Sequence, residues 1–516
     1  MINLIAYGGD SQHFPDHSLD GCIAAYVNGS NSLLISVFFT TDNVCVVSPS
    51  DDLSEISNIN VLISESSWLD ITDVDIGDKF SPGNDKPWKQ VREPYERVPE
   101  RGRLKAPLIN LSKLLHHLPV GMNIIFDLHE DQRLDEHVKN IIEEVNKSDI
   151  NSAEILLPNL DSLSRIIKVF PNINCIVFGL TNKENKKLSV LLEDDRLELA
   201  KSIFTSLDSV DVNVNKSRIY ALCNSIDDLE VAIEDDRISG SVTSSVLEAF
   251  DLIYGRRNIF TELFSGNSLD SNNWISGISS GFEMPTRMLW KKESDERLAK
   301  DTRKNFDTKL TVNNGLVFDI KEGDQYASAG VISKFPVRND FFCELDWKYQ
   351  NPTRATMMLL GITNTDVFRS HQPEYDNEGG VENPRWRDEH QIFDTHGNPP
   401  FVSMEHEEND GTRIICNRVD TGFYRWFNNF YNPNVGDGRT TEGSFRLMRR
   451  NSYYCSYYKD EHNPNWVGVG YVENESMNNS VYMRLGAKHY PKSGVKYPLP
   501  SNYVVFNNLK IYKRTK

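Results

Sequence analysis

The first half of the chain repeats one pattern, in which an apolar run of strand length is followed by a segment whose apolar residues have helical spacing. The expected strands lie in 4–10, twice within 33–53 around a turn at 42–43, and at 122–129, 152–157, 173–180, 217–222 and 238–242; the expected helices lie at 19–26, 110–118, 133–146, 160–169, 187–206, 226–234 and 246–254. Helices between strands favour parallel pairing, and about eight such units in about 250 residues predict a (β/α)8 TIM barrel of the α/β class.

The second half of the chain, after residue 262, changes to strands and turns without a helix of any length. The expected strands lie at 315–320, 329–335, 341–349, 355–362, 412–419, 444–450, 453–459, 466–472, 481–487 and 504–512. Strands joined by Gly, Asn and Pro turns predict an all-β region, an antiparallel two-sheet sandwich. We therefore expect two domains, 1–257 and 262–516, each long enough to fold independently.

Composition excludes several classes of function. The net charge of -18 argues against nucleic-acid binding, which needs a basic surface. No apolar run approaches the roughly 18 residues of a membrane span, and the N-terminal residues lack the basic and apolar regions of a Sec signal. The seven cysteines lie mostly in strand-like runs without metal or redox spacing, which predicts synthesis in a reducing cytoplasm.

The opening of the chain resembles the glycerophosphodiester phosphodiesterase family in its layout. In that family a first strand ends in His-Arg-Gly, Pro-Glu-Asn-Thr leads into a helix, and Glu-Leu-Asp, Lys-Asp-Gly and a strand ending in His-Asp follow. Here the stretch 4–10, the segment 14–18 (Phe-Pro-Asp-His-Ser) and the run 33–53 occupy those places. Similar agreement continues at 67–77, 122–129, 221–224 and near Thr243. The resemblance implies a phosphodiesterase-type TIM barrel.

The resemblance also implies that the site of this barrel is degenerate. The replaced positions are Tyr7 for the first catalytic histidine, Gly8 for the arginine, Leu34 and Ser36 for two metal carboxylates, Pro49 for the second histidine, Asp127 for the third carboxylate and His129 for the lysine. Phosphodiester hydrolysis on this plan needs an acid, a base and a hard cation held by carboxylates. We therefore expect no catalytic residue and no metal there. Asp127 keeps the acidic character of the family position; the alternative is a strand-end carboxylate that is capped or paired.

Two segments of the second half resemble concanavalin-like jelly-roll domains, the sandwich of laminarinases and many carbohydrate-binding modules. Residues 264–274 match the opening Phe-x-x-x-Ser-Leu-Asp-x-x-x-Trp, and residues 445–470 resemble a Leu-Arg-Arg…Tyr…Trp hairpin. Laminarinase-like enzymes carry Glu-x-Asp-x-x-Glu on one strand face. Neither the pair Glu344 and Asp346 nor the acidic run 404–408 reproduces that motif. Glu344 and Asp346 are expected to be solvated outward positions.

A long insertion at 364–440, expected to be rich in loops, combines aromatic residues with Asp, Glu, Asn and His. Sugar rings stack on exposed Trp and Tyr, so Trp386, Tyr424 and Trp426 are the candidate glycan-binding residues. The alternative is that these aromatic residues cover a sandwich edge or a subunit interface. The histidines and acids of the insertion fit no defined metal motif. We expect no cofactor, with a structural Ca²⁺ left open.

Taken together, these patterns predict a catalytically silent phosphodiesterase-like barrel joined to a carbohydrate-binding type of sandwich. The expected role is surface recognition or structure, as in a phage or virus particle or another surface assembly. The expected partners are a carbohydrate or cell-surface glycan and other subunits of the assembly. The competing hypothesis is an active enzyme, either a diverged phosphodiesterase or a polysaccharide-degrading protein.

Overall fold

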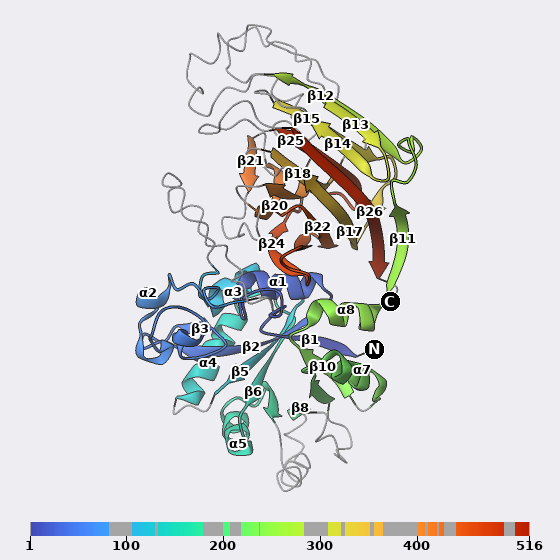
Figure 1. Ribbon diagram of the computed structural model, residues 1–516. Coiled ribbons are helices and arrows are strands. Elements are labelled where there is room, and N and C mark those ends of the chain that lie inside the picture. Colours follow the sequence, from blue (N-terminus) through green and yellow to red (C-terminus); the bar gives the residue numbers. More distant parts are fainter. Residues whose placement is uncertain are drawn as a thin grey trace. The chain divides into compact units, whose positions relative to one another are not determined.

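The computed structural model describes residues 2–81, 106–129, 133–178, 200–206, 218–236, 238–282, 308–320, 326–350, 356–364, 400–407, 411–420, 423–427, 440–489 and 501–514. These residues divide into two compact units, one that ends at Gly255 and one from Arg256 to Arg514 (Figure 1). All seven cysteines are buried and free. Among the described residues, no helix has the length and apolar character needed to cross a bilayer.

The first unit is a closed parallel barrel. Its strands are β1 (Asn3–Tyr7), β2 (Ser32–Phe39), β5 (Asn123–Leu128), β6 (Ser152–Leu157), β7 (Asn174–Phe178), β8 (Ala200–Ser206), β9 (Arg218–Leu222) and β10 (Ile238–Thr243). Each strand pairs in parallel with the next in the order β1-β10-β9-β8-β7-β6-β5-β2, and β1 also pairs with β2, which closes the ring. The expected (β/α)8 barrel is therefore confirmed. Two short strands, β3 (Cys45–Val47) and β4 (Ile109–Asn110), extend β2 outside the ring in antiparallel pairing.

The helices of this unit differ at their N-termini, because some begin at a residue whose side chain caps the first turn and others do not. They are α1 (Leu19–Val27), α2 (Trp68–Ile71), α3 (Leu111–His117), α4 (Leu134–Val145), α5 (Leu160–Val169), α7 (Ile226–Glu234) and α8 (Val246–Tyr254), with the 3-10 turns η1 (Leu53–Glu55) and η2 (Ile63–Glu65). Ser18 Oγ accepts from Gly21 N–H at the start of α1, and Asn110 caps α3 in the same way. A reciprocal pair of bonds between Ser225 and Asp228 opens α7.

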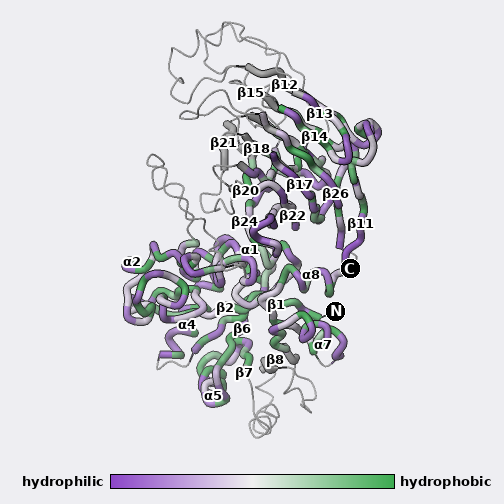
Figure 2. The backbone as a smooth tube through the Cα atoms, viewed as in Figure 1, coloured by the Kyte–Doolittle hydropathy of each residue, from purple (hydrophilic) through white to green (hydrophobic). Residues whose placement is uncertain are grey.

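Side chains from successive strands fill the barrel interior. The buried cluster is Ile5, Leu34, Ile125, Leu156, Ile176, Tyr220 and Val242. Because side chains alternate along a strand, residues two positions apart share the inner face. Figure 2 shows the hydrophobic character of these strands, which is plain in the sequence of β2, SLLISVFF. The barrel therefore has a packed apolar core, and any polar functional group must lie at its end.

One predicted element of the barrel is wrong. The sequence pattern predicts a helix over 187–206, but residues Ala200–Ser206 form β8, which pairs with β7 and β9. Residues 187–199 lie outside the described residues, as does the irregular segment 82–105. Pairing on both sides overrides the local helical spacing at 200–206.

The second unit is an antiparallel β-sandwich, as expected. The first sandwich sheet has the order β13-β14-β26-β17-β22-β23-β24, with β11 on β26; the second has the order β12-β15-β25-β18-β19-β20-β21, with β16 on β25. In chain order the strands are β11 (Arg256–Glu262), β12 (Trp274–Phe282), β13 (Thr308–Val312), β14 (Leu316–Ile320), β15 (Tyr326–Ser333), β16 (Val337–Arg338), β17 (Phe341–Gln350), β18 (Thr356–Thr363), β19 (Phe401–Glu407), β20 (Gly411–Asp420), β21 (Phe423–Phe427), β22 (Glu442–Arg450), β23 (Tyr453–Asp460), β24 (Val467–Glu473), β25 (Ser480–His489) and β26 (Asn502–Arg514).

Aromatic side chains join the two sandwich sheets. His406 of β19 is 1% exposed, and its ring centroid lies 5.0 Å from that of Trp347 on β17. Phe445 of β22 approaches the same imidazole at 6.4 Å. His406 Nδ1 lies 2.9 Å from Thr412 Oγ1. The imidazole is thus part of the sandwich core.

The structure adds strands that the sequence pattern did not predict. They are β11, β12, β13, β16, β19 and β21. Three strands, β19, β20 and β21, lie inside the segment 364–440 that was expected to be rich in loops. The second part of that segment is therefore a meander that extends the second sandwich sheet.

Candidate functional site

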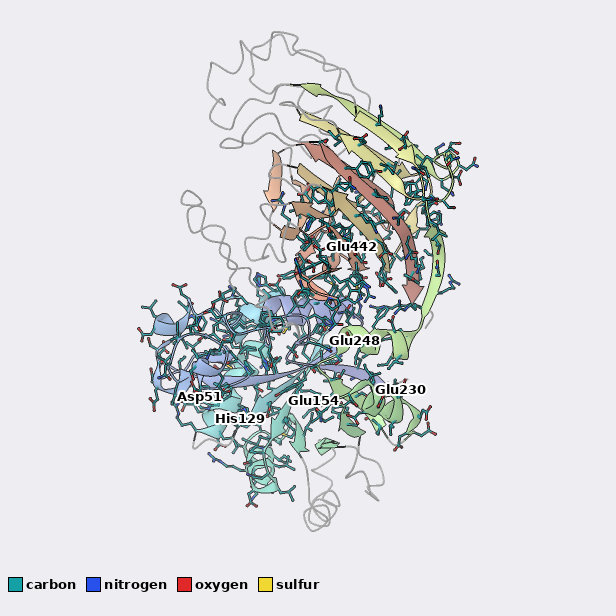
Figure 3. The ribbon with its side chains drawn as sticks, viewed as in Figure 1. Asp51, His129, Glu154, Glu230, Glu248 and Glu442 are labelled. Atoms are coloured by element: carbon teal, nitrogen blue, oxygen red, sulfur yellow. The ribbon has the colours of Figure 1, made fainter. Side chains whose placement is uncertain are left out.

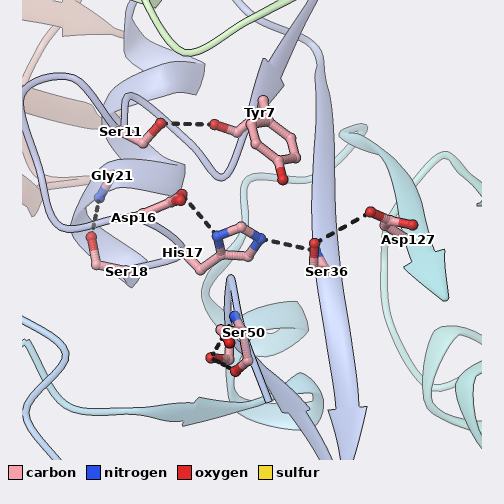
Figure 4. A network of polar contacts seen from close by, with 10 residues as sticks. Tyr7, Ser11, Asp16, His17, Ser18, Gly21, Ser36, Ser50 and Asp127 are labelled. Carbon is pink, nitrogen blue, oxygen red and sulfur yellow. Dashed lines mark hydrogen bonds and ion pairs between the residues drawn. The ribbon is translucent and has the colours of Figure 1, made fainter. Parts of the chain in front are cut away.

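The candidate site lies where the neighbouring strands β1, β2 and β5 end. Tyr7 is the last residue of β1, and Ser36 of β2 is in register with Asp127 of β5. Ser36 Oγ donates a hydrogen bond of 3.5 Å to Asp127 Oδ2 (Figure 4). The carboxyl ends of barrel strands are where such folds place their functional groups. Three of the positions predicted from sequence are thus brought together at one end of the barrel.

Two further residues, Asp16 and His17, complete this group and were not predicted as site residues. Both lie in the loop between β1 and α1. His17 Nδ1 is 2.8 Å from Asp16 Oδ1, and the rings of His17 and Tyr7 meet edge to face with centroids 6.0 Å apart. His17 is fully buried. The signal for them was their place at the family's Pro-Glu-Asn-Thr segment, directly before the first helix.

The hydrogen bonds of His17 determine its tautomer. The backbone N–H of Ser36 donates to His17 Nε2 across 2.8 Å. An amide nitrogen can only donate, so Nε2 must be the acceptor. The proton of the ring is therefore on Nδ1, which donates to the Asp16 carboxylate. Both ring nitrogens are used, and this imidazole is a structural link between the loop and β2.

Gly8 explains why the loop can fold so close to the strand. Its φ is 63°, and a Cβ at this position would lie 1.7 Å from Asp16 Oδ1. Gly8 N–H donates to Leu34 O, and Gly8 O accepts from His17 N–H, each at 2.8 Å. A side chain at position 8 would displace the pair Asp16 and His17. In this chain the space beside position 8 is filled by the loop itself.

Burial sets the protonation of the other two groups. Burial raises the pKa of the Tyr7 phenol, and the nearby Asp16 and Asp127 carboxylates raise it further, against a hydrogen bond with Ser36. Burial also raises the pKa of Asp127, while two neighbouring histidines and the Ser36 hydroxyl lower it. At neutral pH the phenol holds its proton firmly. At this end of the barrel, Tyr7 and Asp127 are thus two titratable groups that both have a raised pKa.

The other predicted positions have separate surroundings. Leu34 is 1% exposed and belongs to the barrel core. Pro49 is half-buried in the turn after β3, beside Ser50, whose carbonyl accepts from Ser48 Oγ at 2.7 Å. His129 is exposed directly after β5, and its ring stacks on Phe38 with centroids 4.9 Å apart (Figure 3).

No metal-binding constellation is present in the part of the chain that the structure describes, where no group of three or more His, Cys, Asp or Glu side chains could hold an ion. Among the described residues, the predicted positions that meet at the barrel end supply one half-buried carboxylate, one phenol and one hydroxyl, from Asp127, Tyr7 and Ser36. Asp16 faces the His17 imidazole. A hard cation in a protein takes about six to eight oxygen ligands with several carboxylates among them, and this donor set does not fit it.

Two of the three candidate glycan-binding residues, Tyr424 and Trp426, lie on a strand of the second sandwich sheet. Trp386 lies outside the described residues. Tyr424 and Trp426 are on β21, where the register pairs them with Val419 and Asn417 of β20. The strand β21 is the last in its sheet order.

The acidic candidates of the sandwich are paired. Glu344 Oε1 accepts from Arg446 Nε at 2.9 Å. Asp346 accepts from Ser444 Oγ at 2.6 Å and from Asn508 Nδ2 at 2.8 Å. These carboxylates were expected to be solvated. The correction is that each is hydrogen-bonded across the sheet, because the adjacent strands carry matching donors in register.

One acid of the second acidic run, Glu405, is paired as well. Glu405 of β19 is 2% exposed, and its Oε2 lies 2.7 Å from Arg413 Nη2 on the neighbouring strand β20. A carboxylate used in this way is a poor candidate for the acid or nucleophile of glycoside cleavage.

The strand pairings define the class of this protein: a closed parallel βα barrel followed by an antiparallel sandwich. The chain is similar to solved structures of glycerophosphodiester phosphodiesterases. For the one from Thermotoga maritima, the identity is 14%, the coverage is 49% of this chain and 98% of that chain, and the TM-score is 0.37. For the one from Agrobacterium tumefaciens, the identity is 13%, the coverage is 48% of this chain and 100% of that chain, and the TM-score is 0.37. For an Oleispira antarctica phosphodiesterase, solved with the product sn-glycerol-3-phosphate, the identity is 15%, the coverage is 49% of this chain and 96% of that chain, and the TM-score is 0.38. No family model and no curated protein matches the chain.

Proposed function

We propose that the barrel is a catalytically silent scaffold. The observation that carries the proposal is the hydrogen bond from Ser36 N–H to His17 Nε2, which commits the buried imidazole at this barrel end to the backbone. Hydrolysis of a phosphodiester on a metal-dependent plan needs an acid, a base and a cation that offsets the charge of the transition state. Tyr7, Leu34 and Ser36 supply none of these at neutral pH.

The test is an assay of the full chain on glycerophosphocholine with Ca²⁺ or Mg²⁺, with and without EDTA. The expected rate equals the buffer rate in every condition, and Asp127→Asn leaves it unchanged. Asp127→Asn is the matched variant because it keeps the shape of the side chain and removes the carboxylate. Turnover that EDTA abolishes and Asp127→Asn reduces would establish the competing reading, an active diverged phosphodiesterase.

We propose that the sandwich, of the concanavalin-like type, supplies recognition of a carbohydrate or cell-surface glycan. Tyr424 and Trp426 support this proposal because they lie on β21, the final strand in the order of their sheet. An aromatic ring gives apolar area and a flat surface that matches the face of a sugar. The whole chain would then serve in a surface assembly with other subunits, such as a phage or virus particle.

A glycan-array screen of the full chain, followed by titration of the best binder, tests this proposal. Trp426→Ala and Trp386→Ala are expected to weaken binding roughly fivefold or more, because a stacking ring contributes on the order of 1 kcal/mol. Trp426→Phe keeps a ring and should retain most of the affinity. The melting temperature should stay near that of the wild type. A large loss of stability in the Ala variants would instead place the tryptophans in a core or a subunit interface.

A further inference from the structure

The loop between β1 and α1 contributes the buried Asp10 and His13 to a charged bridge with the partly exposed Glu248, which the candidate site does not use. His13 is 3% exposed, its Nδ1 lies 3.0 Å from Asp10 Oδ1, and its Nε2 lies 3.2 Å from Glu248 Oε1. Asp10 Oδ2 also accepts from Asn28 Nδ2 at 3.1 Å. Each ring nitrogen faces a carboxylate oxygen, so both donate and the ring is an imidazolium. In agreement, Asp10 and Glu248 overcome the opposing effect of burial and raise the pKa of His13 to about 10.

This bridge connects the first and last βα units of the barrel. Glu248 lies in the first turn of α8, the helix that follows β10 (Figure 3). Nearby, Gln12 N–H donates to Ser244 O across 3.4 Å, just before the helix. At the other end of α8, Tyr254 Oη donates to Gly29 O at 2.8 Å. Both ends of α8 are therefore bonded to residues 10–29.

The bridge acts on α8, the helix after which the chain leaves the barrel. Gly255 follows α8 with a φ of 60°, and β11, the first strand of the second unit, begins at the next residue. Closure of the ring at this point depends on the pairing of β1 with β10, whose residues are far apart in the sequence. Apolar packing alone permits a helix to shift on its neighbours, whereas an ion bridge with two fixed partners specifies one position.

We propose that Asp10, His13 and Glu248, together with the Tyr254 bond, form a clamp that holds α8 on the first βα unit where the chain leaves the barrel. The clamp keeps α8 in one position beside the first βα unit, where the pairing of β1 with β10 closes the ring. It acts on one helix, so its loss loosens α8 before it affects the rest of the barrel.

Hydrogen exchange of the full chain tests the clamp. The variants are Glu248→Ala, which severs the bridge, and Glu248→Gln, which keeps an oxygen that accepts from His13. Both variants remove the negative charge near the N-terminus of α8, so both lose the same interaction with the helix dipole. Ala has a higher helix propensity than Gln. The amides of α8 should exchange about tenfold faster in the Ala variant than in the Gln variant, because a hydrogen bond to a charged group typically contributes at least that factor.

Two controls make the result decisive. Glu143→Gln removes an exposed partner of Lys139, and it should leave α8 unchanged. Tyr254→Phe should loosen the last turn of α8 alone, and it serves if Glu248→Ala does not fold. Equal exchange of α8 in the Ala and Gln variants, or a uniform increase over the whole barrel, would overturn the clamp and leave only general core stabilisation.

Discussion

His17 Nε2 lies 2.8 Å from the backbone nitrogen of Ser36 and accepts its hydrogen bond. A side chain of the first loop thereby satisfies the backbone of the second barrel strand. His17 has a φ of 61°, a backbone conformation that residues other than glycine adopt rarely. Surrounding bonds hold it there, including those to Asp16 Oδ1 and Gly8 O. A histidine at a barrel end is in this case a part of the framework.

His17→Ala is therefore expected to lower the stability of the barrel by about 1–3 kcal/mol, because it leaves the buried N–H of Ser36 unpaired. The measurement is urea unfolding of the full chain, followed by fluorescence. His129→Ala is the matched control, since His129 is exposed and its ring stacks on Phe38; its effect should stay within about 0.5 kcal/mol. Equal effects of the two variants would contradict the structural role of His17.

The stability of the barrel is expected to fall at alkaline pH because of His13. The folded pKa, about 10, lies above the ordinary value of 6.5, so the folded state binds the proton more tightly. The stabilisation is complete below about pH 6.5 and is lost as the pH rises through 10, with a total on the order of a few kcal/mol. Unfolding between pH 7 and 10.5 should show this loss in the wild type and a smaller one in His13→Gln. Identical slopes for both proteins would refute it.

Asp127→Asn is expected to stabilise the barrel at neutral pH. Burial raises the pKa of Asp127, so the folded state disfavours the charged form. The gain should exist above the ordinary pKa of an aspartate, near 4, and disappear below it. Calorimetry at pH 7 should show a rise of roughly 1–3 °C in the melting temperature. A fall would mean that the hydrogen bond from Ser36 outweighs the cost of burial.

Gly443→Ala is expected to destabilise the sandwich and leave the barrel unchanged. An added Cβ would lie 2.3 Å from Lys459 O and 2.6 Å from Trp347 Cζ2, in the middle of the first sandwich sheet. Such overpacking costs typically about 1–3 kcal/mol. Gly266→Ala separates the two possible causes, because an added Cβ there meets open space and only the strained φ of 98° would be costly. A parallel loss in the barrel transition would contradict independent folding of the two units.

Much of this fold can be predicted from periodicity. The alternation of apolar runs and helical segments indicates the barrel, and period-two runs indicate strands such as β17, β22 and β26. The helix predicted over 187–206 is wrong at 200–206, because β8 takes its conformation from strands on both sides. The strands β19 and β21 were missed because Gly, Asn and charged residues surround them. Local pattern cannot report partners that are distant in sequence.

The candidate site was harder to predict for a different reason. Tyr7, Ser36 and Asp127 lie at strand ends, where the βα rhythm places them together. His17 reaches Ser36 only because Gly8 adopts a positive φ and lets the loop fold back. That contact joins a side chain to a backbone amide, so the residue type at position 36 does not predict it. The pairing of Glu344 with Arg446 likewise depends on a strand register that no local pattern fixes.

The pairing of β26 affects how the protein folds while it is being synthesised. It pairs with β14, β17 and β11, so it joins segments of the first sandwich sheet that precede it in the chain by more than 150 residues. On the ribosome, the barrel strands are complete once residue 243 has emerged. The sandwich sheet, by contrast, keeps a gap at its centre until residues 502–514 follow. Throughout that interval β14 and β17 present unpaired edges, and a nascent chain in this state is exposed to aggregation and to chaperones.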